Sequence, residues 1–182
     1  MSPFERKFGK YAIRNLSYVL VICYAIGYLI QILVPGIFWF LTLDPYAILH
    51  GQIWRLVTWI LIPPSSSNIF FTLIMLYFYC SIGTTLEHTW GTYRYNVYLF
   101  SGMLFTIVGS FLLMGYTYLL PSESVSNTLA FYGAENYFRL ISSVFSTYYI
   151  NMSIFLAFAA TFPDVSVMLM FIIPVFKSKR NK

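Results

Sequence analysis

Residues 15–43 read NLSYVLVICYAIGYLIQILVPGIFWFLTL, a run that contains no charged side chain. A helix needs about 20 apolar residues to cross a hydrocarbon core of about 30 Å, and this run is longer than that. Pro35 and Gly36 interrupt it, so we predict a membrane-spanning helix over residues 16–34. No small-residue cleavage site follows the apolar run, which argues against a removable signal peptide.

Three further runs without charge cover residues 56–86, 95–122 and 140–163. They predict spans over residues 69–86, 95–119 and 147–162. Only 9% of the chain is charged, whereas an average soluble domain has about 25%. The alternative, four buried helices of a soluble bundle, would need amphipathic partner helices, and the sequence has none. We therefore predict an all-α fold, a polytopic transmembrane helix bundle of about four spans in one domain, residues 1–182.

Basic residues predict the orientation, because cytoplasmic loops carry an excess of Lys and Arg. With the N-terminus inside, every basic residue of the chain except Arg55 and Arg139 falls on the cytoplasmic side. The opposite orientation would invert that ratio. We expect a multi-pass protein of the cell membrane with both termini in the cytoplasm. The same bias reports topology, so no nucleic-acid partner is expected.

The segments outside the spans are expected to lie at the membrane surface. Residues 35–68 form an outer loop whose aromatic side chains suit the headgroup layer: Phe38, Trp39, Phe40, Tyr46, Trp54 and Trp59. Residues 121–146 form a second outer segment, with a short interfacial helix over 137–141. Residues 165–176 are too short to span and are expected at the inner interface, with a tight fifth span as the alternative. The basic tail, 177–182, would lie near anionic headgroups.

Small residues recur every fourth position on two predicted spans, a spacing that allows helices to approach closely. They are Gly102, Thr106 and Ser110 on one span, and Ser153, Ala157 and Thr161 on the other. We expect them to pack within the chain, with a dimer interface as the alternative.

The side chains offer little chemistry. Cys23 and Cys80 lie in different spans, which argues against a structural disulfide or a cysteine-rich metal site. His50 and His88 are predicted on opposite sides of the membrane, so they cannot share a zinc ion. There is no glycine-rich phosphate loop and no carboxylate cluster in the sequence. We expect no metal and no cofactor.

Arg55 and Glu87 are the charged residues closest to the apolar spans. Burying either at bilayer depth would cost about 2.5–3.5 kcal/mol or more, so both should sit at interfaces with polar partners. We expect each to act as a structural anchor. Arg55 in particular should tie the outer loop down through backbone carbonyls or lipid phosphate, since its guanidinium has five donors.

Several short motifs follow one another in a specific order: HGQIWRLVT at 50–58, GTTLE at 83–87, WGTYRY at 90–95, YLFSG at 98–102, AFAATFP at 157–163 and FIIP at 171–174. In order and spacing they resemble the rhomboid family of intramembrane serine proteases over residues 5–176, and more closely the rhomboid-like membrane proteins of Gram-positive bacteria. The positions that match the family's structural motifs are His50, Gly51, Trp54, Arg55, Gly83, Glu87, Gly91, Arg94, Ser101 and Gly102.

The resemblance implies a catalytic serine in a Gly-x-Ser-Gly motif that opens the fourth helix, and a histidine on the sixth helix as its base. An Asn and a His on the second helix would stabilise the oxyanion, because serine catalysis needs both a base and fixed donors. Counting by the family's spacing puts Met75 in the Asn slot, Phe71 in the His slot and Tyr148 in the serine slot. The chain contains no Gly-x-Ser-Gly motif.

No catalytic residue is therefore predicted. A slip of the spacing would offer Ser146, but without flanking glycines, and the sequence ends before the family's fifth and sixth helices. We interpret the chain as a pseudoprotease, a scaffold that recognises other transmembrane segments or associates with itself. Its expected contact face is the stripe Ser153, Ala157 and Thr161.

Two alternatives stay open: a protease with an unrecognised pair such as His50 with Ser146, and a truncated remnant of one. A transporter would want paired intramembrane charges or broken helices in matching halves, and neither is visible.

Overall fold

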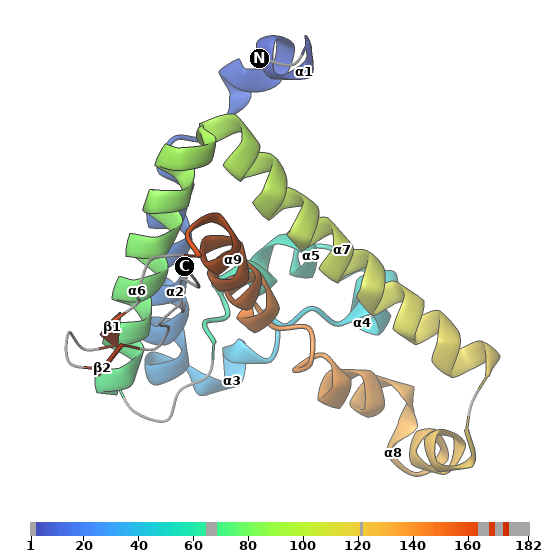
Figure 1. The fold of residues 1–182 in the computed structure, drawn as a ribbon. Helices are drawn as coiled ribbons and strands as arrows, with labels where there is room; N and C mark the ends of the chain where they lie inside the picture. The colour runs from blue at the N-terminus through green and yellow to red at the C-terminus, as the bar shows by residue number, and fades with distance from the viewer. Residues whose placement is uncertain (1–2, 65–68, 121, 164–167, 170–172, 175–182) are drawn as a thin grey trace, which may run out of the picture.

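The computed structural model describes residues 3–64, 69–120, 122–163, 168–169 and 173–174. Its helices and 3-10 turns, in chain order, are α1 (Pro3–Phe8), η1 (Gly9–Tyr11), α2 (Leu16–Leu33), α3 (Pro35–Phe38), α4 (Pro45–Leu49), α5 (Arg55–Thr58), η2 (Trp59–Leu61), α6 (Ile69–Trp90), α7 (Thr92–Leu119), α8 (Glu123–Ile141) and α9 (Tyr148–Thr161) (Figure 1). Two-residue strands β1 (Met168–Leu169) and β2 (Ile173–Pro174) pair antiparallel. The predicted inner segment 165–176 is described only at these strands, and the tail 177–182 lies outside the described residues.

Among the described residues, three helices are long and apolar enough to cross a membrane. They cover Glu5–Leu33, Phe70–Trp90 and Thr92–Leu119. This architecture confirms the predicted all-α transmembrane bundle. The fourth predicted span corresponds to α9, which has only 14 residues. At 1.5 Å per residue it extends about 21 Å, less than the hydrocarbon thickness of about 30 Å.

The turn between α6 and α7 is tighter than the sequence predicts. We expected helix ends at residue 86 and a restart at residue 95, whereas α6 continues to Trp90 and α7 begins at Thr92. Gly91 alone separates them, with φ 85°, a conformation that suits glycine. Charge marks where a chain leaves the hydrocarbon, but a helix can continue beyond that point.

The second outer segment is also more regular than expected. We predicted a short helix over residues 137–141, whereas α8 has 19 residues. The Ser122 hydroxyl accepts a hydrogen bond from the Val125 amide, and Glu123 stands in the first turn, both favourable at a helix start. Gly133, with φ 76° and ψ 157°, is not helical, so α8 consists of two shorter helices joined at a kink.

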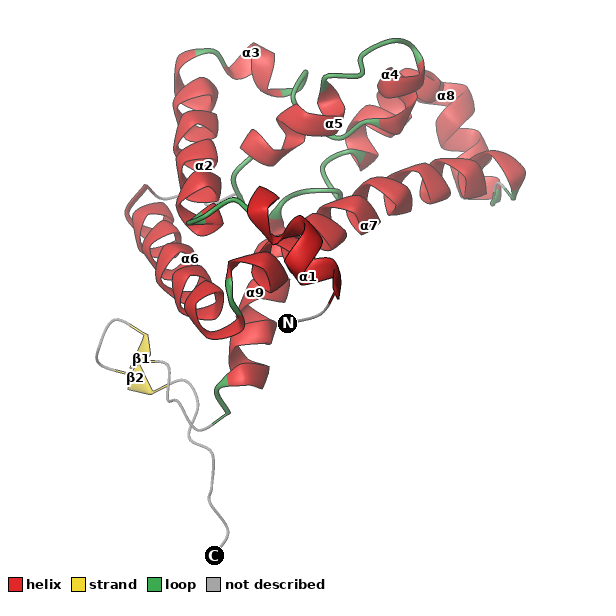
Figure 2. Cartoon of the chain, turned by 90° about the horizontal axis from the view of Figure 1, so that it is seen from above, coloured by secondary structure: helices red, strands yellow, loops and turns green. Residues whose placement is uncertain are grey.

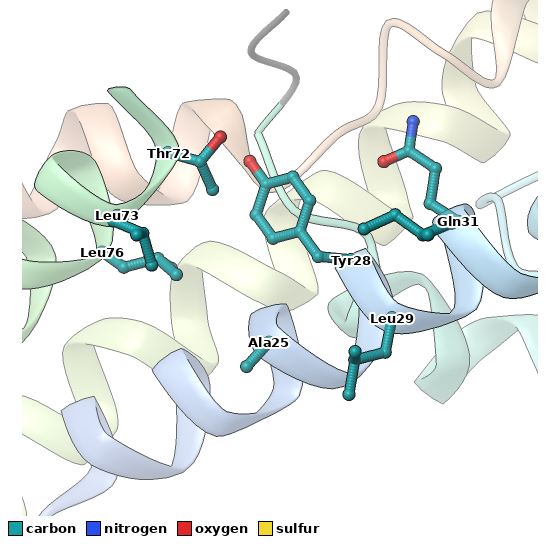
Figure 3. A pocket seen from close by; sticks show the side chains of 8 residues that line it. Ala25, Tyr28, Leu29, Gln31, Thr72, Leu73 and Leu76 are labelled. Atoms are coloured by element: carbon teal, nitrogen blue, oxygen red, sulfur yellow. The ribbon is translucent and has the colours of Figure 1, made fainter. Parts of the chain in front are cut away.

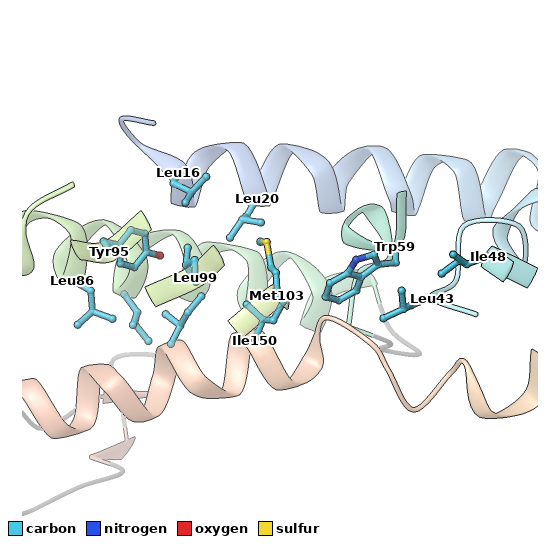
Figure 4. Packing of buried hydrophobic residues seen from close by; sticks show 12 residues of the cluster. Leu16, Leu20, Leu43, Ile48, Trp59, Leu86, Tyr95, Leu99, Met103 and Ile150 are labelled. Carbon is cyan, nitrogen blue, oxygen red and sulfur yellow. The ribbon is translucent and has the colours of Figure 1, made fainter. Parts of the chain in front are cut away.

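The core lies where α2, α6, α7 and α9 meet (Figure 4). Leu20 from α2, Leu86 from α6, Leu99 from α7 and Ile150 from α9 are all buried in one cluster. The outer loop contributes too, because Trp59 is fully buried. Because burial within the bundle does not give the depth of a residue in the membrane, the headgroup-layer position of Trp59 stays a prediction. The Trp59 indole is retained in the bundle because its Nε1 donates to the Leu56 carbonyl at 3.1 Å.

Figures 1 and 2 show how the ends of the molecule differ. The N-terminal helix α1 and the α6–α7 turn lie at one end, whereas α3 and α8 lie toward the other. Seen from above, α8 is on the opposite side of the molecule from α6, and α9 lies in the middle (Figure 2). At the first of these ends, Nη2 of the largely exposed Arg94 lies 3.8 Å from Glu5 Oε2.

Candidate functional site

The three slots that the rhomboid likeness assigns to catalysis lie on two helices that pack together. Phe71 and Met75 stand on α6, and Tyr148 opens α9, which packs against α6. Phe71 and Tyr148 are both exposed. The Tyr148 ring meets the Tyr149 ring edge to face, with centroids 5.7 Å apart. Phe and Met side chains cannot donate a hydrogen bond to an oxyanion.

The alternative pair, His50 with Ser146, is engaged elsewhere. His50 Nδ1 lies 2.8 Å from the Tyr46 carbonyl oxygen, and the centroids of the His50 and Tyr46 rings are 4.2 Å apart. Ser146 Oγ accepts from the Tyr148 amide at 3.4 Å, at the start of α9. A serine–histidine pair needs a direct hydrogen bond, and neither of these contacts supplies one.

Arg55 is the anchor of the outer loop, as the sequence predicts. Its side chain is only 6% exposed. Nη1 donates to the carbonyl oxygens of Trp39 at 2.9 Å and Thr42 at 3.1 Å, and Nε donates to Gln52 Oε1 at 2.7 Å. Burial lowers the pKa of the Arg55 guanidinium from its ordinary value, and the nearby Asp44 charge opposes that shift. The hydrogen bonds join α5 to the chain after α3.

Asp44 completes this loop, and the sequence analysis missed it. It is 2% exposed, and its Oδ1 accepts from the amides of Tyr46 at 3.0 Å and Ala47 at 3.2 Å. An Asp directly before a Pro is a usual signal of a helix start. The carboxylate accepts hydrogen bonds from the free amides of the first turn, and Pro has no amide hydrogen that would need an acceptor. Asp44–Pro45 carries that signal.

Two motif residues shape the turn between α4 and α5. His50 ends α4, and Gly51 follows with φ 98°. A side chain at Gly51 would be strained at that φ, which explains the glycine. Trp54 is half exposed, consistent with the predicted headgroup position.

The opposite end of the bundle is held by Glu87, which is 6% exposed. Its Oε1 accepts from the Asn15 amide at 2.8 Å, while its Oε2 has no hydrogen-bond partner among the described residues. Asn96, which the sequence analysis did not single out, binds the same segment, because its side chain donates to and accepts from the backbone of Ile13, both at 2.9 Å. The link between η1 and α2 is thereby fixed to α6 and α7.

Gly83 allows α6 to approach α2 and α7. A Cβ at this position would overlap the Ser17 hydroxyl and lie 2.6 Å from the Tyr95 hydroxyl. Those two hydroxyls are hydrogen-bonded to each other at 2.8 Å. The glycine therefore makes room for a buried polar contact between α2 and α7.

The small-residue stripe on α9 packs within the chain. The Tyr98 hydroxyl donates to the Ser153 carbonyl at 2.9 Å, and Trp90 Nε1 donates to Thr161 Oγ1 at 3.1 Å. Ala157 packs on the core cluster. These contacts agree with the expected intramolecular packing for α9, whereas association of a partner along this stripe stays a prediction.

The stripe on α7 behaves differently. A Cβ at Gly102 would meet no atom of the described residues within 4 Å, its own helix aside. Ser110, two turns further on, is buried, but its hydroxyl donates to the Ile107 carbonyl of the same helix. The equal spacing of these residues therefore does not define one packed face.

A cleft of about 540 Å³ opens between α2 and α6 (Figure 3). Its walls include Ala25, Tyr28 and Gln31 from α2 and Thr72, Leu73 and Leu76 from α6. The Tyr28 hydroxyl donates to the Pro64 carbonyl at 2.8 Å, which fixes one wall. Phe71 and Met75, two of the positions that the rhomboid resemblance assigns to catalysis, are sequence neighbours of the residues that form the α6 wall. The cleft and these two positions therefore lie on the same helix. No signal in the sequence distinguishes this cleft from ordinary apolar packing.

Comparison with known proteins gives one family. A family model described as a eukaryotic integral membrane protein family, DUF1751, matches residues 14–181, which include the cleft, both anchors and all the slot residues. No curated protein and no solved structure matches the chain. The description establishes membrane integration. It names neither the rhomboid family nor bacteria, so the Gram-positive origin inferred from the motifs gains no support.

Proposed function

We propose that this chain, which belongs to the DUF1751 family of eukaryotic integral membrane proteins, is a rhomboid-like pseudoprotease that binds other membrane proteins. In this proposal the bundle recognises transmembrane segments without cutting them. Both termini face the cytoplasm, as the distribution of basic residues favours.

The slot residues support the absence of proteolysis. Attack by serine needs a hydroxyl activated by a base, and the tetrahedral intermediate needs preorganised donors. Phe71, Met75 and Tyr148 occupy the slots for these groups. Phe and Met cannot donate, and the Tyr148 phenol is not a replacement for an activated serine.

The cleft between α2 and α6 carries the proposal of binding. In lipid, helices associate through close packing and polar contacts, because hydrocarbon tails already solvate an apolar surface. A cleft of about 540 Å³ gives another helix a concave surface to pack into. Gln31 stands exposed at its wall and offers a side-chain amide to a polar residue of that helix.

Site-specific photocrosslinking in native membranes tests the proposal. A photoreactive side chain at Leu73, in the cleft, should yield a protein adduct whose crosslinked peptide maps to a transmembrane segment. The same probe at Leu112, which is similarly exposed on α7, is the matched control. The adduct should disappear when Ala25→Trp fills the cleft and weaken with Gln31→Leu. Lipid adducts alone at Leu73, or an adduct indifferent to Ala25→Trp, would refute binding in this cleft.

A further inference from the structure

We propose that the N-terminal segment and α7 together form a binding site for an anionic phospholipid. A second cleft, of about 400 Å³, lies between them. Phe8 and Tyr11 form one side, and Val97, Phe100 and Leu104 of α7 form the other. The cleft shares no lining residue with the one between α2 and α6, so this proposal does not depend on the binding of other membrane proteins there, although it uses the proposed topology.

The α7 wall suits an acyl chain. Val97, Phe100 and Leu104 are spaced by three and four residues, which puts them on one face of the helix. Their seven-residue separation corresponds to about 10 Å along a helix that is long enough to span the membrane. All three are about half exposed although they line the cleft, so the groove is open toward the surrounding lipid. Tyr11, 71% exposed, borders it on the other side.

Cations stand at the rim of this groove. Lys7 Nζ lies 5.7 Å from the centroid of the Phe8 ring, and Lys10 Nζ lies 4.9 Å from the centroid of the Tyr11 ring. Both rings line the cleft, so each ammonium group lies close to an aromatic ring of the cleft lining. The carboxylate of Glu5, in the same segment, pairs with Arg94 at 3.8 Å. The rim therefore presents positive charge next to an apolar groove.

A phospholipid has an anionic headgroup for the cationic rim and an acyl chain for the apolar groove. Its phosphate belongs at the membrane surface. The two elements α1 and the α6–α7 turn lie at the same end of the bundle (Figure 1), and the proposed topology puts this end at the cytoplasmic surface. The acyl chain runs inward, as the α7 groove does. Anionic lipids are concentrated in the cytoplasmic leaflet, which is the leaflet that the proposed topology gives to this end. Free phosphate would occupy the rim without using the groove.

Lipid retention tests the site. The protein is reconstituted in nanodiscs of phosphatidylcholine and phosphatidylserine, extracted in mild detergent, and its retained lipids are quantified by mass spectrometry. We expect phosphatidylserine to be enriched severalfold over its share of the nanodisc. Lys7→Gln with Lys10→Gln should return the ratio to that of the bulk lipid, whereas Lys7→Arg with Lys10→Arg should preserve the enrichment.

A second pair of variants tests the groove itself. Leu104→Trp should fill the groove and lower the amount of retained phosphatidylserine, with both lysines intact. Leu112→Trp, on the same helix outside the cleft, is the control and should retain as much as the unmodified protein. No enrichment in the unmodified protein, or enrichment unaffected by the Lys→Gln pair, would overturn the proposal. Sensitivity to Lys→Gln without sensitivity to Leu104→Trp would also overturn it, because it would indicate general charge attraction.

Discussion

Glu87 on α6 accepts a hydrogen bond at 2.8 Å from the backbone amide of Asn15, 72 residues earlier in the chain. Asn15 precedes α2 in a left-handed conformation, φ 57°, which Asn tolerates better than most residues. The carboxylate therefore stabilises an unfavourable backbone turn as well as a contact between two spans. This is a structural task, and it explains why a charged residue persists at the end of a spanning helix.

Two substitutions of Glu87 distinguish the contribution of its hydrogen bond to stability from the contribution of its charge. Glu87→Ala removes the acceptor of the part-buried hydrogen bond from the Asn15 amide and should lower the free energy of unfolding by about 1–3 kcal/mol. Glu87→Gln keeps a carbonyl acceptor and should cost clearly less. Thermal melting in detergent measures both. An equal loss in the two variants would mean that the charge, not the hydrogen bond to Asn15, is what matters.

Arg55 should be a stronger anchor than its neighbour Arg139. Arg55→Ala leaves the Trp39 and Thr42 carbonyls without their donor and should destabilise the protein by about 1.5–3 kcal/mol, the usual range for hydrogen bonds to charged groups. Arg139 is exposed and lies over the Trp39 ring at 5.5 Å. Arg139→Ala should change stability by about 0.5 kcal/mol or less. Melting curves that do not distinguish the two variants would contradict the anchor.

Three glycines should respond to alanine in a defined order. A Cβ at Gly27 would overlap the backbone carbonyl of Leu61, which cannot rotate away, so Gly27→Ala should be the most damaging. At Gly83 the obstacles are two hydroxyl groups, which can shift, so the cost should be smaller. Gly102 has open space among the described residues and lies within α7. Gly102→Ala should therefore raise the free energy of unfolding by about 0.5–1 kcal/mol. Melting temperatures that do not follow this order would show that the spans pack differently.

The long helices could be predicted from the sequence because absence of charge over a membrane thickness is a local property. The predicted span over residues 147–162 also agrees with α9, Tyr148–Thr161, to within one residue at each end, but the contact that fixes its start could not be predicted. Residues 140–163 are free of charge, yet α9 starts only at Tyr148. Directly before it, the fully buried Thr147 donates from its hydroxyl to the Ile62 carbonyl, 85 residues away. Hydropathy does not report such a contact.

The polar anchors show a similar limit. Arg55 and Glu87 could be identified because charge is rare in this chain. Their partners could not, since backbone groups carry no signal in the sequence. Within the core, Tyr24 and Asn151 lie 127 residues apart and their side chains are hydrogen-bonded at 3.1 Å. Both are buried in apolar helices, where the sequence marks neither as a partner of the other.

Topology is predicted by charge and can be measured directly. In a background without Cys23 and Cys80, single cysteines at Ser2 and Ser178 should be protected from an impermeant maleimide in intact cells. A cysteine at Ser122, before α8, should react. The signal after permeabilisation is the control for expression and reactivity. Labelling of the cysteine introduced at position 178 in intact cells would mean that residues 165–176 cross the membrane.

The pseudoprotease proposal makes a prediction about reactivity. Fluorophosphonates label a serine only when a base has activated its hydroxyl, so the purified protein should not be labelled. Ser146 is the residue to examine, because it is the serine nearest in sequence to Tyr148, the position that the rhomboid resemblance assigns to the nucleophile. In the structure its Oγ accepts a hydrogen bond from the Tyr148 amide, and His50, the alternative base, contacts Tyr46. Neither arrangement would generate a reactive alkoxide, so Ser146→Ala should leave the background signal unchanged. If the protein is labelled and Ser146→Ala removes that label, Ser146 is an active nucleophile and the pseudoprotease proposal is wrong.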